Sequence, residues 1–359
     1  MGLFLRYCLP FLLTEGNIGA FHGRCLQFQI TSTRADFVRM RQNENYRRLR
    51  DLTELIETEI DDVVDLSAPY QAMTRCYLLI LQRLSLPERT VTFFPTPDCI
   101  LSRNALRMMK QRIEAGSRAI MLCGLRLDLE GVGPALDRLL ARGADAASEL
   151  ELSGLGLQHL HQIALHCDTA SSEFWVGWPA HLYWIAQDRS WLLAHCFHLH
   201  PMAVLGIPKV IDINTTIDGD YLLSFHLRRD QFYFCENSGE LVCLELSPRA
   251  KRINSRTGRL TPRHLSRFMA LYGNSLHREF FARPILIRGS WEPAIPSQVR
   301  EQAAQIVGIV ERGPNFIDRC VGAIFSMIRK NPAMRRCARS LLRAGRRIQL
   351  TFQPARSSK

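Results

Sequence analysis

Hydrophobic and polar residues follow two different spacings along the first part of the chain. The pattern predicts, in order, a strand over residues 3–13, a strand over 25–31, a helix over 35–50, a short strand within 52–66 and a helix over 68–84. The first run is almost wholly apolar, and Pro10 is expected to bend or break it. Ser32 or Thr33 can cap the first helix, because its hydroxyl accepts a hydrogen bond from a free backbone amide.

The next stretch, residues 90–125, is expected to form the centre of the fold. Its pattern predicts a strand over 90–94, a helix over 105–115 and a strand over 119–123, which together make one βαβ unit. The loop after the first strand carries a single acid, Asp98, between Pro95 and Pro97. Since open α/β sheets bind ligands at the carboxyl ends of their parallel strands, we expect Asp98 to face a ligand.

Helical spacing becomes more frequent toward the C-terminus. Residues 191–196 predict a strand, and residues 231–235 and 240–246 predict two strands joined by a hairpin at Ser238 and Gly239. Further helices are expected over 262–272, 295–310, 316–328 and 333–347. The prediction is therefore an α/β domain over residues 1–250, followed by a helical C-terminal region over 251–359.

Charge is distributed unevenly along the 359 residues. The net charge is +12, no acid follows Asp318, and 11 basic residues do, so the rest of the chain is nearly neutral. The helix over 333–347 places arginines around an apolar stripe, which is typical of a basic amphipathic helix on an anionic membrane. The alternative is a helix packed on the domain with a solvated arginine face. We expect no nucleic-acid partner, because the tail lacks interleaved aromatic residues for base stacking.

The cysteines and the N-terminal residues indicate the cellular compartment of the protein. The sequence has 11 cysteines and no CxxC pair, which indicates free thiols in a reducing environment. Residues 3–13 do not fit a signal peptide, because Pro10 interrupts them, no positive residue precedes them and no small-residue cleavage site follows. No segment reaches the roughly 18 apolar residues of a membrane span. A cytoplasmic protein is expected, peripheral on the inner face of the membrane through its basic helix.

Two short motifs carry candidate chemistry in the second half of the α/β region. His198 and His200 stand two apart before Pro201, so on an extended backbone both imidazoles point the same way and suit a divalent metal or a phosphate. Asp218 and Asp220 flank a glycine and offer either metal ligands or a catalytic base. The alternatives are a packed or surface histidine pair and an acid-rich turn.

Three further residues are candidates for binding a nucleotide. Arg126 follows the predicted strand 119–123 and can meet a phosphate in a bidentate manner, or else pair with Asp128 or Glu130. Glu15 and Asn17 can contact a base or a ribose, or else cap a turn over residues 18–22. No GxGxxG, GxxxxGK[ST], GxSxG or HExxH motif is present, which argues against dinucleotide enzymes, P-loop ATPases, α/β hydrolases and zincins.

The order of these features resembles the nucleotide-binding half of glycosyltransferases of the GT-A fold. The resemblance rests on a first segment ending in TEGN, a second strand ending in TST, and the segments FFPTPDCILS and GSRAIML. PTPDCILSRNAL, HLHPM and TIDGDYL are similar to segments of a little-characterised bacterial group of such proteins. The likeness covers roughly residues 1–250 and implies a Rossmann-like mixed sheet with flanking helices.

In the GT-A fold, an Asp-x-Asp motif holds a divalent metal on the donor diphosphate. This chain departs from it, because Thr96 stands where the first acid is expected. Either Asp98 holds Mn or Mg together with His198 and His200, or the enzyme works without a metal, or activity is lost.

The resemblance implies transfer of a sugar from a nucleoside diphosphate sugar to a glycan or lipid-linked acceptor. Donor-binding roles then fall to Glu15, Asn17, Thr31, Asp98 and Arg126, and Asp218 or Asp220 acts as the base or positions the acceptor. The alternatives are a metal-dependent phosphohydrolase that uses the same His and Asp residues, and a catalytically silent scaffold at a membrane.

Overall fold

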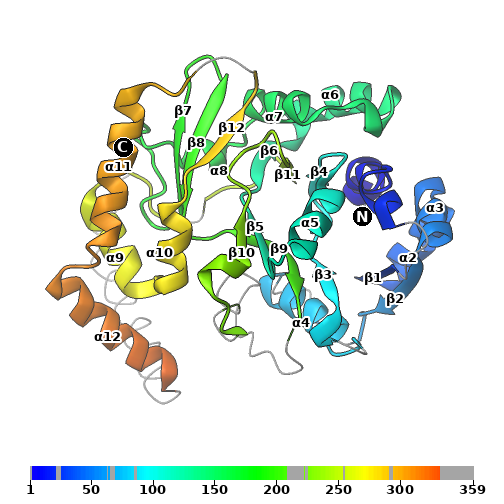
Figure 1. The fold of residues 1–359 in the computed structure, drawn as a ribbon, viewed down its shortest axis with the longest axis horizontal. Helices are drawn as coiled ribbons and strands as arrows, with labels where there is room; N and C mark the ends of the chain where they lie inside the picture. Colours follow the sequence, from blue (N-terminus) through cyan, green and yellow to red (C-terminus); the bar gives the residue numbers. More distant parts are fainter. Residues whose placement is uncertain are drawn as a thin grey trace, which may run out of the picture.

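The fold is a mixed α/β structure with several small sheets (Figure 1), 46% helix and 21% strand. A computed structural model describes residues 2–21, 26–62, 64, 69–84, 87–207, 222, 225–253, 255–290 and 294–331. Figure 1 shows β1 and β2 with α2 and α3 on one side of the molecule, and the C-terminal helices on the opposite side. The α/β class predicted from the sequence is confirmed.

The largest sheet has four strands in the order β10-β5-β9-β3. Its strands are β3 (Val91–Phe93), β5 (Ala119–Leu122), β9 (His200–Leu205) and β10 (Phe232–Phe234). β9 runs antiparallel to both β3 and β5, so these two are parallel to each other, and β10 is parallel to β5. With α5 (Ala105–Glu114) between them, β3 and β5 form the predicted βαβ unit, although β9 is inserted between its strands.

A second sheet lies next to this unit in the order β4-β11-β6. It consists of β4 (Cys99–Leu101), β6 (Leu125–Asp128) and β11 (Cys243–Ser247), with β11 antiparallel to β4 and parallel to β6. The predicted hairpin between β10 and β11 is wrong, since each strand pairs with a different sheet. A turn does form at Asn237. It leads the chain from β10, which pairs with β5, to β11, which lies between β4 and β6.

The third sheet, β12-β8-β7, separates two hydrophobic cores. Its strands are β7 (His181–Ile185), β8 (Trp191–Cys196) and β12 (Ile285–Arg288). Successive residues face opposite sides, so Tyr183 and Ala194 join the main core, whereas Trp184 and Leu193 pack toward the C-terminal helices. β12 corrects the expectation of a wholly helical C-terminal region, because this segment pairs with β8.

The N-terminal strand predicted over residues 3–13 is wrong. This run forms a π-helical turn, Phe4–Cys8, and a short helix, α1 (Leu9–Leu12), which packs against β4. A short, continuously apolar run suits a buried helix as well as a buried strand. Pro10 is the second residue of α1 and directly follows the π-helical turn, an irregularity of the kind found where regular helical bonding is interrupted.

The segment that follows agrees with the prediction except for one break. β1 (Gln27–Ser32) and β2 (Glu54–Glu59) form a parallel two-stranded sheet. The predicted helix over 35–50 is two helices, α2 (Arg34–Gln42) and α3 (Glu44–Leu52). Thr33 caps α2 as expected, and Asn43 both ends α2 and caps α3 by accepting a bond from Tyr46 N.

The remaining helices flank these sheets. They are α4 (Pro69–Leu81), α6 (Leu129–Ala141), α7 (Glu149–Gln158), α8 (Gln162–Leu165), α9 (Pro262–Tyr272), α10 (Ser275–Ala282), α11 (Ser297–Glu311) and α12 (Phe316–Lys330), with 3₁₀ turns at Ile18–Phe21, Pro87–Arg89, Ala144–Ala146 and Arg229–Gln231. The basic helix predicted over 333–347 lies outside the described residues. Within the part of the chain that the structure describes, no helix is both long and apolar enough to cross a membrane.

Candidate functional site

Asp98 lies in the turn that connects β3 to β4. The Thr96 hydroxyl donates a hydrogen bond of 2.6 Å to the Asp98 carboxylate, and the backbone carbonyl of Asp98 accepts one of 2.9 Å from Leu246 N. Thr96, at the position where the resemblance expects a first acid, therefore orients the acid that is present. The Asp98 side chain is partly exposed, which leaves it accessible from solvent.

Arg126 lies on β6 opposite Glu245 of β11. Its guanidinium donates to the Glu245 carboxylate and to the Ser247 hydroxyl, both at 2.8 Å. The side chains of Arg126 and Glu245 are 28% and 26% exposed, so the pair is neither buried nor fully solvated. The alternative pairing of Arg126 with Asp128 or Glu130 is wrong. Arg126 and Asp128 share a face of β6, but Arg126 pairs with Glu245 directly across from it, and Asp128 pairs with Arg249.

Lys251 links Asp98 electrostatically to the Arg126–Glu245 pair. Partial burial of its ammonium group lowers the pKa of Lys251, the positive charge of Arg126 lowers it further, and Asp98 and Glu245 oppose both effects. We call Asp98, Arg126, Glu245 and Lys251 the charge cluster. Two residues predicted from the sequence to bind a donor, Asp98 and Arg126, thus belong to one group of two acids and two bases.

Two neighbours hold the charge cluster in place. Gly124, between β5 and β6, has no room for a Cβ atom, which would lie 2.9 Å from Cγ of Glu245 and closer still to its carboxylate. His161 is buried, and its backbone N–H donates to the carbonyl of Arg126 at 2.9 Å. Burial lowers the pKa of His161, the bond from its ring to the Pro248 carbonyl partly offsets this, and the charge of Arg126 adds to the lowering.

Asn17 is fully buried, and its side chain forms hydrogen bonds with other residues of the protein. Its amide nitrogen donates to the carbonyls of Phe11 and Ser102, and its amide oxygen accepts from Leu106 N in the first turn of α5. The predicted capping of residues 18–22 is thus replaced by a bond to α5. These contacts tie the end of α1 to the loop before α5, and they occupy the amide that was expected to meet a nucleotide.

Glu15 and Thr31, the other two N-terminal residues predicted to bind the donor, do not belong to the charge cluster. Glu15 is exposed, and its backbone N–H donates to Asp145 at 3.3 Å. Thr31 is on β1 opposite Thr58, in the two-stranded sheet rather than in a sheet that bears the charge cluster. The structure therefore does not bring either residue together with Asp98 and Arg126 in one site.

His198 and His200 have different surroundings. The ring of His198 stacks on Trp178, with centroids 5.6 Å apart, and lies 4.5 Å from the ring of His277. Nε2 of His200 donates to the Phe94 carbonyl at 2.8 Å, because a carbonyl oxygen only accepts. One histidine therefore contacts the C-terminal helices and the other the end of β3. Asp218 and Asp220 lie outside the described residues.

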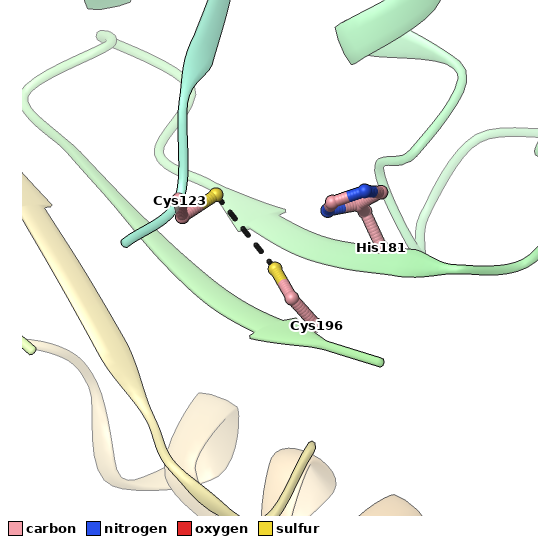
Figure 2. Close-up of side chains that lie close together, drawn as sticks. All are labelled: Cys123, His181 and Cys196. Carbon is pink, nitrogen blue, oxygen red and sulfur yellow. Dashed lines mark hydrogen bonds between the residues drawn. The ribbon is translucent and has the colours of Figure 1, made fainter. Parts of the chain in front are cut away.

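The described residues contain a single group of three side chains suited to holding a metal ion, and it is not the predicted one. One ligand atom each of Cys123, His181 and Cys196 lies within 4.8 Å of the other two (Figure 2), whereas Asp98, His198 and His200 form no such group. Cys123 directly follows β5, His181 begins β7, and Cys196 ends β8, where it is the direct cross-strand partner of His181. We call these three residues the thiol–imidazole cluster.

The two thiols of this cluster interact strongly. Their sulfur atoms are 3.8 Å apart, and the Tyr183 hydroxyl lies 3.9 Å from Sγ of Cys123. The hydrogen bond from Cys196 lowers the pKa of Cys123 to about 5, against the effect of burial and with help from His181 and Tyr183. Burial and the neighbouring Cys123 raise the pKa of Cys196. No short motif reveals this group, since the two cysteines are 73 positions apart in the sequence.

Comparison with known proteins does not assign the chain to a family. It finds no matching family model, no matching curated protein and no matching solved structure.

A groove of about 550 Å³ lies between the β7–β8 pair and the C-terminal helices α9 and α11. Trp184, Trp191 and Asp168 contribute to its lining, and burial raises the pKa of the Asp168 carboxyl. None of the predicted site residues that the structure describes lines it. The groove and the charge cluster are therefore separate features of the surface.

Proposed function

We propose that this protein is a glycosyltransferase with a GT-A-like core, which moves a sugar from a nucleoside diphosphate sugar to a glycan or lipid-linked acceptor. The observation that carries the proposal is the charge cluster. Asp98 and Arg126, chosen from the sequence as donor-binding residues, lie on either side of β11. Leu246 N on β11 donates to the Asp98 carbonyl, Glu245 on β11 pairs with Arg126, and both Asp98 and Arg126 act electrostatically on Lys251. The position of Asp98 in the turn after β3, a strand parallel to β5, also agrees with ligand binding at strand ends.

The cations of the charge cluster suit a diphosphate. A departing nucleoside diphosphate gains negative charge, and fixed cations close to its oxygens stabilise that charge. Arg126 is planar and holds a defined orientation through Glu245 and Ser247, while Lys251 supplies a second positive charge from a more exposed position. We propose that both contact the donor phosphates and that Asp218 or Asp220 serves as the base or positions the acceptor.

We propose a divalent metal ion that has fewer protein ligands than the sequence predicts. Among Asp98, His198 and His200, only Asp98 belongs to the charge cluster, so the histidines are not expected to complete a common site. Magnesium and manganese favour oxygen ligands, and magnesium is commonly held by one or two carboxylates together with substrate phosphates. One partly exposed carboxylate fits that arrangement, in which the ion arrives with the donor.

The proposal is tested by incubating the protein with a panel of nucleotide sugars, with and without manganese. A donor that binds the folded state raises the unfolding temperature by mass action, and transfer is measured as acceptor-dependent release of the nucleoside diphosphate. Asp98→Asn should lower the transfer rate by about 100-fold or more, since it removes one preorganised charge. Asp137→Asn is the matched control, because Asp137 forms an exposed ion pair with Arg6 and does not belong to the charge cluster.

The same experiment separates the alternatives. A phosphohydrolase would release product without an acceptor and without preference for one nucleotide sugar. A silent scaffold would show neither donor binding nor release, and Asp98→Asn would then leave every measured property unchanged. Either result would contradict the proposed transfer.

We also propose that the protein is cytoplasmic and attaches to an anionic membrane surface, on the inner face, through its C-terminal segment. Helix α12 supports this, because it leaves large apolar side chains exposed: Phe316 at 74%, Ile317 at 72%, Ile324 at 53% and Met327 at 56%. The chain beyond Asp318 carries only positive charge, which adds attraction to anionic lipid.

Flotation with vesicles of phosphatidylcholine and phosphatidylglycerol tests this attachment. Replacing Ile317 and Ile324 by Ser, or deleting residues 332–359, should each weaken binding several-fold, because apolar burial and charge both contribute. Val38→Ser is the control, since Val38 is 50% exposed on α2 and far from this segment in the sequence. Equal binding of all four proteins would exclude α12 and the tail as the attachment surface.

A further inference from the structure

We propose that Cys123, His181 and Cys196 bind one zinc ion, which connects the end of β5 to the β7–β8 pair. The inference concerns a different group of residues from the charge cluster and does not depend on the proposed transferase activity. It is also a different site from the manganese or magnesium contact proposed for Asp98.

The convergence of three ligand atoms, each within 4.8 Å of the other two, carries the argument, and the distance between the two sulfur atoms agrees with it. With zinc–sulfur bonds of about 2.3 Å and a tetrahedral angle, two thiolates on one zinc ion lie about 3.8 Å apart. Sγ of Cys123 and Sγ of Cys196 are 3.8 Å apart, whereas a disulfide requires a sulfur separation of about 2.0 Å. The backbone thus holds the two sulfur atoms at the spacing of metal ligands without a bond between them.

The third side chain completes a recognised type of donor set. Direct pairing of His181 with Cys196 across β7 and β8 fixes the imidazole beside the thiol, and Figure 2 shows the three side chains converging from two separate parts of the fold. Nδ1 of His181 is buried and has no hydrogen-bond partner among the described residues. Coordination would give a buried nitrogen of this kind the partner that it lacks.

The chemistry of the donors selects the metal. Thiolate and imidazole suit zinc and other borderline or soft ions, while magnesium and manganese favour oxygen. Two cysteines and one histidine leave one position of a tetrahedral zinc ion for water or another ligand, as in zinc sites with an open position. Tyr183, two residues after His181 on the same face of β7, places its hydroxyl 3.9 Å from Sγ of Cys123 and can orient that ligand.

Metal content measured on the full-length protein tests the site. Protein prepared without chelators should contain about one zinc per chain, as a single site of this donor set predicts. Cys123→Ser and Cys196→Ser should each lower zinc affinity by at least about 100-fold, more than the loss of an outer-shell contact. His181→Ala should do the same, whereas His181→Cys should retain zinc because it supplies a third thiolate.

A second pair of cysteines in the same protein provides the control. Cys99 and Cys243 are both buried and their sulfur atoms are 3.7 Å apart, but they belong to no three-ligand group among the described residues. Cys243→Ser should therefore remove a buried thiol and leave zinc content unchanged. If it lowers zinc content as much as Cys196→Ser, the site is wrongly assigned.

Wild-type protein gives an independent measurement if the variants fold poorly. After chelator treatment, added zinc should raise the unfolding temperature by roughly 4 °C, as expected for a ligand well above its dissociation constant, and magnesium and manganese should not. Cobalt added in place of zinc should give the visible absorption of a tetrahedral thiolate site. Metal-free protein that takes up neither ion, or a Cys123–Cys196 disulfide found by mass spectrometry in protein isolated without oxidant, would overturn the proposal.

Discussion

Cys123 of the thiol–imidazole cluster and Arg126 of the charge cluster are only three positions apart at the β5–β6 connection, yet the two clusters have opposite chemistry. Arg126, on β6, is a quarter exposed and holds a carboxylate. Cys123, at the end of β5, lies among buried thiols and an imidazole. We propose that the first cluster binds a polar ligand reversibly and that the second retains a metal ion through soft ligands. A short connection can thus supply two sites when its residues face different layers of the fold.

The two clusters are not electrically isolated from each other. Burial raises the pKa of Cys167, the negative charge of Cys123 raises it further, and the guanidinium of Arg126 opposes both. Arg126 is therefore within range of a buried thiol as well as of Glu245. Substitutions on one side of the connection test how far the two clusters depend on each other.

Arg126→Met is expected to have the largest effect. It leaves the Glu245 carboxylate without its guanidinium partner, and we expect a loss of about 2 kcal/mol, between the values for exposed and for buried ion pairs. Urea unfolding measures it, and Glu245→Gln in the same background should restore part of the loss. Zinc content should stay unchanged. A loss of zinc in Arg126→Met would mean that the clusters form one site.

Tyr183→Phe is expected to act on the other cluster alone. Removing the hydroxyl near Cys123 should weaken zinc binding by about tenfold, the lower end for outer-shell contacts. Competition with a chelating dye measures this change. Tyr233→Phe is the control, because the Tyr233 hydroxyl bonds to Glu240 and not to a residue of either cluster. Equal zinc affinity in both variants would remove Tyr183 from the site.

Gly124→Ala should disturb the charge cluster without changing any charged residue. The added methyl group would collide with the side chain of Glu245 and force the carboxylate away from Arg126, at a cost of about 1 kcal/mol. Gly308→Ala on α11 is the matched control, since its nearest neighbour would be 3.6 Å from the new atom and helix propensity favours alanine. Should Gly124→Ala be as stable as Gly308→Ala, Glu245 has another position open to it.

The smallest expected effect is a pH dependence that comes from His161. Its pKa in the folded protein lies below the ordinary value of 6.5, so the unfolded chain binds the proton more readily. The contribution of neutral His161 to the free energy of unfolding is fully present above pH 6.5. It is lost as the pH falls from 6.5 toward the lower pKa of His161 in the folded protein. The free energy of unfolding, measured with urea, should be higher at pH 7.5 than at pH 5.5. In His161→Gln this difference between the two pH values should shrink, by less than about 1 kcal/mol. His166→Gln, at the end of α8, serves for comparison.

The two clusters also differ in how far the sequence predicts them. Asp98 was found because it is the one acid in a proline-bounded loop after a predicted strand, so the signal is local. The thiol–imidazole cluster has no local signal, because Cys123 meets Cys196 only after β8 has packed beside the end of β5. Spacing rules for metal ligands search within a few residues, and they pass over ligands that the fold assembles.

The elements of the fold show the same limit. β1, β2, α4, α5 and β8 follow from residue spacing and were predicted near their observed positions. The helix at residues 4–12 was predicted as a strand because continuous apolar character does not distinguish the two. The expected hairpin of β10 and β11 failed because neighbouring strands in the sequence found better partners in different sheets. Pairing between distant segments is decided by packing, which residue spacing does not contain.

The placement of β11 between β4 and β6 has a consequence for synthesis of the chain. Apart from the backbone bonds that join β6 to residues 159–161, β4 and β6 pair in this sheet only with β11, so the edges that face β11 wait for residues 243–247. At ~5–20 residues per second, β6 stays without its neighbour for roughly 6–24 s after it is made. During that time its apolar residues and unpaired amides are open to other chains. We expect the growing polypeptide to need chaperone protection until the last strand of this sheet has left the ribosome.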